Sequence, residues 1–154
     1  MPETKPYIYQ AGQGESIAIG PASMLIKTVN SDSSDRLFVA EQFMPPMFAG
    51  PPSHIHDEMD HTFYILEGTL RLVITGEEYL ATAGSFVFVP RATVHSFGNA
   101  SESPTRFLEV NVPGGFERYY RDLASAFPVG SAIDPARMQA SMREVQQRHG
   151  IRPV

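Results

Sequence analysis

Four of the five histidines in the 154-residue chain stand at spacings that suit metal binding. His54 and His56 are two residues apart, so on an extended strand both imidazoles point to the same face. His61 follows after a short polar loop, and a hairpin would bring its ring back beside the pair. His95 lies much further along the chain, after a predicted strand and turn, and needs only to face the same interior. This pattern favours one metal site over four unrelated polar histidines.

The composition restricts what else could bind a metal. The chain has no cysteine, which excludes a disulfide framework, a thiolate zinc site, an iron–sulfur cluster and a cysteine nucleophile. The fifth histidine, His149, falls in the last turn of a predicted terminal helix, where a partly positive imidazole interacts favourably with the helix dipole. We therefore do not expect His149 to be a ligand.

Charge and hydropathy narrow the class of partner. Twelve Lys and Arg residues are scattered among 17 Asp and Glu residues, giving a net charge of −5, so the concentrated positive patch that nucleic acids require is absent from the sequence. No stretch approaches the roughly 20 consecutive apolar residues that span a bilayer, and residues 1–10 lack the features of a signal peptide. We expect a cytoplasmic protein that binds a small molecule, without nucleic acid or membrane.

Short β-strands are predicted to position the histidines. Up to Gly115, β-rich runs alternate with Gly, Pro and Asn turns at the spacing of an all-β sandwich or barrel. After it come two helical patterns, the second with Asp134 as N-cap, Pro135 at the first helical position and Gly150 as its stop. The predicted strands are 17–19, 24–29, 37–44, 61–66, 69–75, 79–82, 84–89, 94–97 and 106–112, with a polar turn at 30–35, and the predicted helices are 116–126 and 134–149. We expect a single domain: a barrel over about 15–113, closed by a helical segment over about 116–149.

The segments that hold the histidines resemble the two sequence motifs of the cupin family. The first motif is His-x-His, a spacer, Glu, six residues and Gly; here it is read as His54-Ile55-His56, residues 57–60, His61, residues 62–67 and Gly68. The second is Gly, five residues, Pro-x-Gly, two residues, His, three residues and Asn; here it is read as Gly84, Pro90-Arg91-Ala92, His95 and Asn99. The resemblance covers residues 50–112 closely. It implies an all-β cupin jelly-roll β-barrel with C-terminal helices, holding one divalent metal ion on His54, His56, His61 and His95.

The chain departs from the cupin pattern at three positions. Ala92 replaces the usual Gly, and the opening Gly of the first motif is displaced to Gly50, which are details of turns. Position 61 is His where most metal-binding cupins have Glu, and this change bears on chemistry. Four neutral imidazoles leave the cation its full charge, which favours Lewis-acid behaviour over the stabilisation of higher oxidation states. Zinc is the metal we expect, and Ni, Fe, Mn and Cu stay open.

Acidic side chains near the motif have two possible roles. Asp57, Glu58 and Asp60 either accept hydrogen bonds from the imidazoles, which would compensate the missing ligand charge, or form a solvated loop. Glu41 and Glu109 interrupt apolar strands. Either is a candidate catalytic base if it points inward, where burial would raise its pKa; an outward orientation stays open for both.

Aromatic residues on the predicted strands suggest a pocket. Phe63 shares the face of His61, and Phe97 shares the face of His95, because side chains alternate along a strand. Together with Phe43 they are expected to line a cavity that suits a flat aromatic or polyketone substrate; the alternative is that they belong to the core.

The resemblance implies three possible activities. The chain is similar to small cyclases of aromatic polyketides, of the resistomycin type in antibiotic biosynthesis, in which a metal would act as Lewis acid for aldol-type ring closure. It also resembles, more distantly, quercetinase-like dioxygenases, which usually keep Glu at position 61. A non-catalytic binding protein is the third possibility. Residues 6–10 are able to add to a neighbour's sheet, so we also expect a homodimer.

Overall fold

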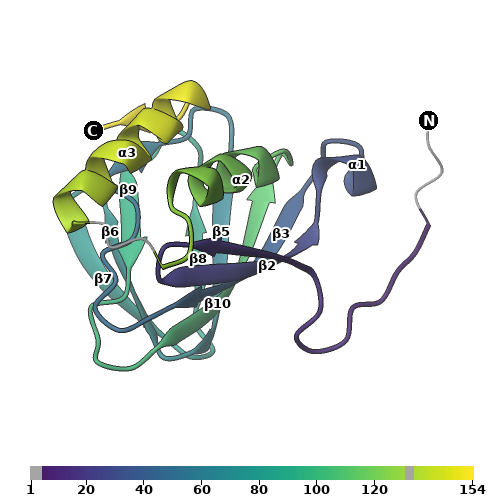
Figure 1. Ribbon diagram of the computed structural model, residues 1–154, viewed down its shortest axis with the longest axis horizontal. Coiled ribbons are helices and arrows are strands. Elements are labelled where there is room, and N and C mark those ends of the chain that lie inside the picture. Colours follow the sequence, from purple (N-terminus) through teal and green to yellow (C-terminus); the bar gives the residue numbers. More distant parts are fainter. Residues whose placement is uncertain (1–4, 131–133) are drawn as a thin grey trace.

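The computed structural model describes residues 5–130 and 134–154, and Figure 1 shows strands folded over one another with two helices lying together above them. The strands are β1 (Glu15–Ile19), β2 (Ala22–Thr28), β3 (Phe38–Met44), β4 (His54–Ile55), β5 (Asp60–Glu67), β6 (Thr69–Ile74), β7 (Glu77–Thr82), β8 (Phe86–Val89), β9 (His95–Gly98), β10 (Thr105–Val112) and β11 (Arg152–Pro153). The helices are α1 (Asn30–Ser33), α2 (Glu117–Ala126) and α3 (Pro135–Arg148).

The strands form two antiparallel sheets, which confirms the all-β prediction. The first has six strands in the order β1-β2-β3-β10-β5-β8, and the second has five in the order β11-β4-β9-β6-β7. The expected polar turn at 30–35 contains the single helical turn α1, and α2 and α3 lie where helices were predicted. Asp134 caps α3 by accepting a hydrogen bond from the backbone N–H of Arg137.

Alternation along the strands places polar side chains inside the protein. In β3 and β10, which pair along their length, every second side chain is buried. The inward side chains are Phe38, Ala40, Gln42 and Met44 from β3, and Thr105, Phe107, Glu109 and Asn111 from β10. A carboxylate, two amides and a hydroxyl therefore lie among the apolar side chains of these two strands, where they need hydrogen-bond partners.

The apolar core consists of two clusters with the histidines between them. One cluster joins β1, β2 and β3 to the helices, and includes Phe38, Tyr120 and Leu123. The other lies between the sheets and includes Phe63 and Phe97. The His61 ring contacts Phe63, with ring centroids 4.4 Å apart, and also Phe116 at the start of α2, with centroids 6.0 Å apart. The histidines thus belong to the packed interior.

One topological prediction is wrong. We expected a hairpin to return His61 beside His54 and His56. Instead β4 belongs to the five-stranded sheet and β5 to the six-stranded sheet, so the intervening loop crosses from one sheet to the other. In the part of the chain that the structure describes, no helix has the length and apolar character needed to cross a membrane.

Candidate metal centre

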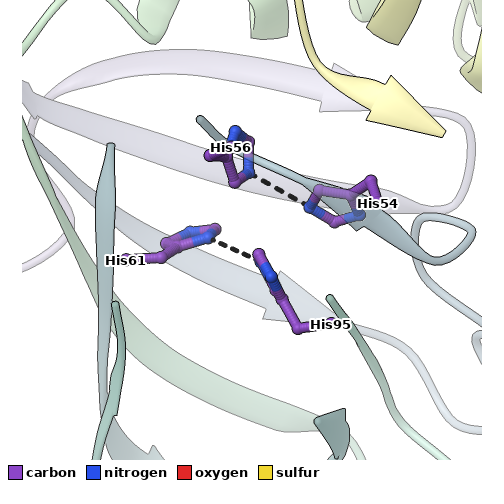
Figure 2. A group of neighbouring side chains, drawn as sticks. All are labelled: His54, His56, His61 and His95. Atoms are coloured by element: carbon purple, nitrogen blue, oxygen red, sulfur yellow. Dashed lines mark hydrogen bonds between the residues drawn. The ribbon is translucent and has the colours of Figure 1, made fainter. Parts of the chain in front are cut away.

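Both sheets contribute to a cluster of four buried imidazoles (Figure 2). His54 on β4 lies directly opposite His95 on β9 in the five-stranded sheet, and His56 follows two residues later. His61 reaches the cluster from β5 in the other sheet. One nitrogen from each ring lies within 4.8 Å of those of the other three, and each side chain is at most 5% exposed. The structure thus brings together all four residues that the sequence nominated.

Hydrogen bonds define which nitrogen of each ring faces the cluster. His54 Nδ1 lies 2.8 Å from the carbonyl oxygen of Pro52, and His95 Nδ1 lies 2.9 Å from that of Thr93. Because a carbonyl only accepts, both Nδ1 atoms carry hydrogen and both Nε2 atoms keep a lone pair. In His61 the roles are reversed, since its Nε2 donates to Glu109 Oε1 at 2.6 Å. His61 therefore presents Nδ1.

The four ring nitrogens that face one another are arranged as ligands of a single cation would be. His61 Nδ1 and His95 Nε2 are 3.3 Å apart, and in neutral rings with these tautomers their lone pairs face each other. His54 Nε2 and His56 Nε2 are 3.1 Å apart. Burial, helped by neighbouring histidines, lowers the pKa of His54 to about 3 and of His95 to about 4, and lowers that of His56 further. Neutral imidazoles are the form that binds a divalent metal, so His54, His56 and His95 suit one. His61 completes the set of four ring nitrogens by its position.

Glu109 points inward, but its surroundings are not those expected of a catalytic base. It is fully buried, and four groups donate to its two oxygens. Oε1 accepts from His61 and from Asn111 Nδ2 at 2.8 Å, and Oε2 accepts from Gln42 Nε2 at 2.6 Å and the Tyr120 hydroxyl at 2.7 Å. Burial alone would raise the pKa of Glu109, but His61 and these hydrogen bonds together lower it below its ordinary value. A raised pKa was therefore the wrong expectation.

Glu41 lies outside the cluster. Its carboxylate contacts Arg106 at 2.8 Å and Lys27 at 3.2 Å on the outer face of the six-stranded sheet, and its pKa is lowered, since these cations outweigh its partial burial. Because β3 alternates, the inward position belongs to its neighbour Gln42 instead. The structure therefore gives Glu41 no contact with the histidines.

The acidic loop does not serve the imidazoles. Asp57 forms an ion pair with Arg152 at 2.6 Å, and Asp60 forms one with Arg91 at 2.8 Å. Glu58 is exposed. The carboxylate that accepts from a cluster imidazole comes from Glu109 on β10 and not from this loop. The solvated-loop alternative therefore describes these three residues.

A cavity of about 40 Å³ adjoins His54 and His61. Phe97 lines it and also belongs to the apolar cluster between the sheets. Phe63 packs in the core against the His61 ring, and Phe43 sits half-exposed on the outer face of β3, away from the cavity. The core alternative thus holds for Phe63, and Phe43 belongs to neither group.

The sequence predicts the helix that closes the barrel but assigns no pocket residue to it. Phe116 at the N-cap of α2 and Tyr119, Tyr120 and Leu123 within α2 all line the cavity. The Phe116 ring lies 5.3 Å from that of His56. The spacing i, i+3, i+4, i+7 is an apolar stripe that could have indicated a helix packed over the barrel. The stripe could not have indicated that the helix lies against the histidine cluster.

A known protein domain matches the part of the chain that holds the four histidines. Residues 41–111, which include the four histidines and Glu109, match the model of the cupin domain. The chain carries a cupin domain. It is 31% identical over 135 residues to quercetin 2,3-dioxygenase from Bacillus subtilis (strain 168), and the match covers 88% of this chain but 39% of the dioxygenase. The chain thus spans about two fifths of that relative's length.

Solved structures agree on the cupin jelly-roll fold. KdgF from Halomonas sp. superposes with a TM-score of 0.63 at 15% identity, covering 74% of this chain and 99% of KdgF. The polyketide cyclase RemF from Streptomyces resistomycificus superposes with a TM-score of 0.60 at 24% identity, covering 70% of this chain and 80% of RemF. These likenesses establish the fold of the cupin domain.

Proposed function

We propose that this cupin is a metal-dependent polyketide cyclase of aromatic polyketide biosynthesis that closes rings by aldol-type condensation. The observation that carries the proposal is the donor set, in which His61 supplies an imidazole where most metal-binding cupins have a carboxylate. His54, His56, His61 and His95 would hold the ion, for which we propose zinc. Such an ion supplies a Lewis acid that polarises a carbonyl oxygen without any change of oxidation state.

The side chains around the cluster support chemistry on an apolar, flat substrate. Phe97, Phe116 and Tyr119 line the space beside the histidines and give it a mainly apolar wall. Burial raises the pKa of both Tyr119 and Tyr120, so their hydroxyls stay protonated. With four donors on Glu109 and Glu41 on the outer face, neither glutamate is assigned as the base that removes the methylene proton.

The size of the cavity adds a condition. About 40 Å³ is far below the roughly 300–1,000 Å³ of pockets that hold drug-sized ligands. A polyketone therefore enters only if the wall of the cavity opens, and α2 with its N-cap Phe116 supplies four of the lining side chains. Movement of this kind is common in enzymes that exclude water during reaction.

The test is an anaerobic cyclisation assay. A poly-β-ketone thioester is incubated with zinc-loaded and zinc-depleted protein, and ring closure is followed by absorbance and mass spectrometry. We expect turnover without dioxygen by the loaded protein, loss of activity on depletion and in His95→Ala, and no change in the control Glu41→Gln. Equal rates with and without metal would refute the proposal.

A dioxygenase is the second candidate, and the 31% identity to quercetin 2,3-dioxygenase over 88% of the chain favours it. The discriminating experiment incubates protein loaded with Fe, Mn, Ni or Cu with a flavonol and measures dioxygen uptake with an electrode. Uptake coupled to flavonol loss supports this candidate and contradicts the cyclase. If both assays fail while metal binds, a non-catalytic binding cupin is the remaining proposal.

We also propose that the protein is a homodimer. Residues 6–10 lie in the purple N-terminal segment of Figure 1 and belong to no strand in the described part of the chain. The Tyr7 hydroxyl donates to the carbonyl oxygen of Lys27 at the end of β2, but Tyr7, Ile8 (83% exposed) and Tyr9 are all exposed. Exposed apolar residues in an extended segment suit pairing with the sheet edge of a second copy. Light scattering of the full chain and of a variant lacking residues 1–10 tests this; a full-length monomer would contradict it.

A further inference from the structure

We propose that Glu109 and His61 act as one unit in the metal centre: Glu109 fixes His61 as an Nδ1 ligand and gives the centre the negative charge that four neutral imidazoles lack. This inference rests on the metal site of the proposed function but not on the reaction. Glu109 is thus a positioning residue rather than a catalytic one.

The orientation of His61 carries the first half of the inference. Its Nε2 is 2.6 Å from Glu109 Oε1, so this nitrogen holds a hydrogen and cannot bind an ion. His54 and His95 donate through Nδ1 to backbone carbonyls and present Nε2. His61 is therefore the one of these three rings that binds through Nδ1, and the one whose outer partner is charged.

The partners of Glu109 carry the second half. Among the described residues, its hydrogen-bond partners are His61, Gln42, Asn111 and Tyr120, none of which carries a fixed positive charge. A carboxylate that is 0% exposed needs a compensating cation, because burial of an unpaired charge is strongly unfavourable. Without a metal, a second proton on His61 Nδ1 would compensate Glu109 by making the His61–Glu109 contact an ion pair. A divalent ion held by the four histidines would take the place of that proton.

This arrangement changes the charge of the centre. A divalent ion with four neutral imidazoles carries two positive charges, and with Glu109 included the buried unit carries one. A site of three imidazoles and one carboxylate ligand carries the same total. The negative charge lies further from the ion, by the width of one imidazole, than it would on a carboxylate ligand. The hydrogen bond from His61 Nε2 to Glu109 also makes the His61 ring a more basic ligand for the metal.

Metal affinity provides the test. The affinities of the wild-type protein, Glu109→Gln and Glu117→Gln for Zn²⁺ and Co²⁺ are measured by competition with a chromophoric chelator. Glu117 is a matched control, since it is 4% exposed and accepts from the backbone N–H of Asn30, away from the histidines. We expect affinity to fall about 10–100-fold in Glu109→Gln. Equal affinity in Glu109→Gln and wild type overturns the inference, and so does an equal loss in both variants.

A measurement on the wild-type protein avoids any dependence on the folding of a variant. In ¹⁵N-labelled protein loaded with ¹¹³Cd²⁺, scalar coupling identifies which nitrogen of each histidine binds the ion. We expect coupling to His61 Nδ1, with a protonated Nε2. Coupling to His61 Nε2 overturns this inference and leaves the proposed function intact, whereas wild-type protein that binds no divalent metal removes both.

Discussion

Replacing His61 by Glu restores the ligand type that most metal-binding cupins have at this position, yet the structure predicts that this chain will tolerate it poorly. The substitution places a second carboxylate where the His61 ring now separates Glu109 from the cluster. His61 Nε2 lies 2.6 Å from Glu109 Oε1, so the new carboxylate would lie about 5 Å from Glu109. At an effective dielectric constant of about 20, two like charges at this distance repel by about 3 kcal/mol.

Adding Glu109→Gln to His61→Glu removes that repulsion. In a double-mutant cycle on metal-free protein, we expect the double variant to be more stable than the sum of the single variants by about 3 kcal/mol or more. The excess arises because the cycle also contains the hydrogen bond from His61 to Glu109, and bonds to charged groups are worth about 1.5–3 kcal/mol.

Urea unfolding of the four proteins, followed by circular dichroism at pH 7, measures the coupling. Additive free energies of unfolding, within about 0.5 kcal/mol, would show that positions 61 and 109 do not sense each other's charge. The reasoning about this pair would then be refuted, whatever metal the protein binds.

Three further outcomes are expected. Zinc at about 1,000 times its Kd should raise the free energy of unfolding by about 4 kcal/mol in the wild-type protein and in His149→Ala, but not in His95→Ala; calorimetry checks this. Leu123→Ala, which truncates a buried side chain of α2, should cost about 2–5 kcal/mol of stability in urea unfolding and should strengthen the binding of a flat aromatic ligand in a fluorescence titration. Phe97→Ala should weaken that binding, whereas Phe43→Ala should leave it unchanged, because Phe43 is on the outer face.

The strands and the four histidines could be predicted because their signals are local. Alternating apolar residues, turn residues and the His-x-His pair each act over a few positions, and nine of the eleven described strands lie within two residues of their predicted bounds. The two-residue strands β4 and β11 were not among the predicted ranges. The path between His56 and His61 could not be predicted in this way. Their spacing suits a hairpin within one sheet, but the chain uses the same residues to cross between sheets, a choice made by tertiary packing.

The role of Glu109 shows why the chemistry of a site is harder to predict than its ligands. Strand alternation already groups Glu109 with Phe107 and Asn111 on one face of β10. An inward glutamate in an apolar strand is compatible with a base of raised pKa or with an ionised partner of another group, and the sequence near it does not distinguish them. The difference comes from Gln42 on β3, Tyr120 on α2 and His61 on β5, three elements that are distant in sequence. Because these donors occupy its oxygens, the carboxylate that resembled a catalyst is bound into the structure around His61, and any proton acceptor for the substrate must come from elsewhere.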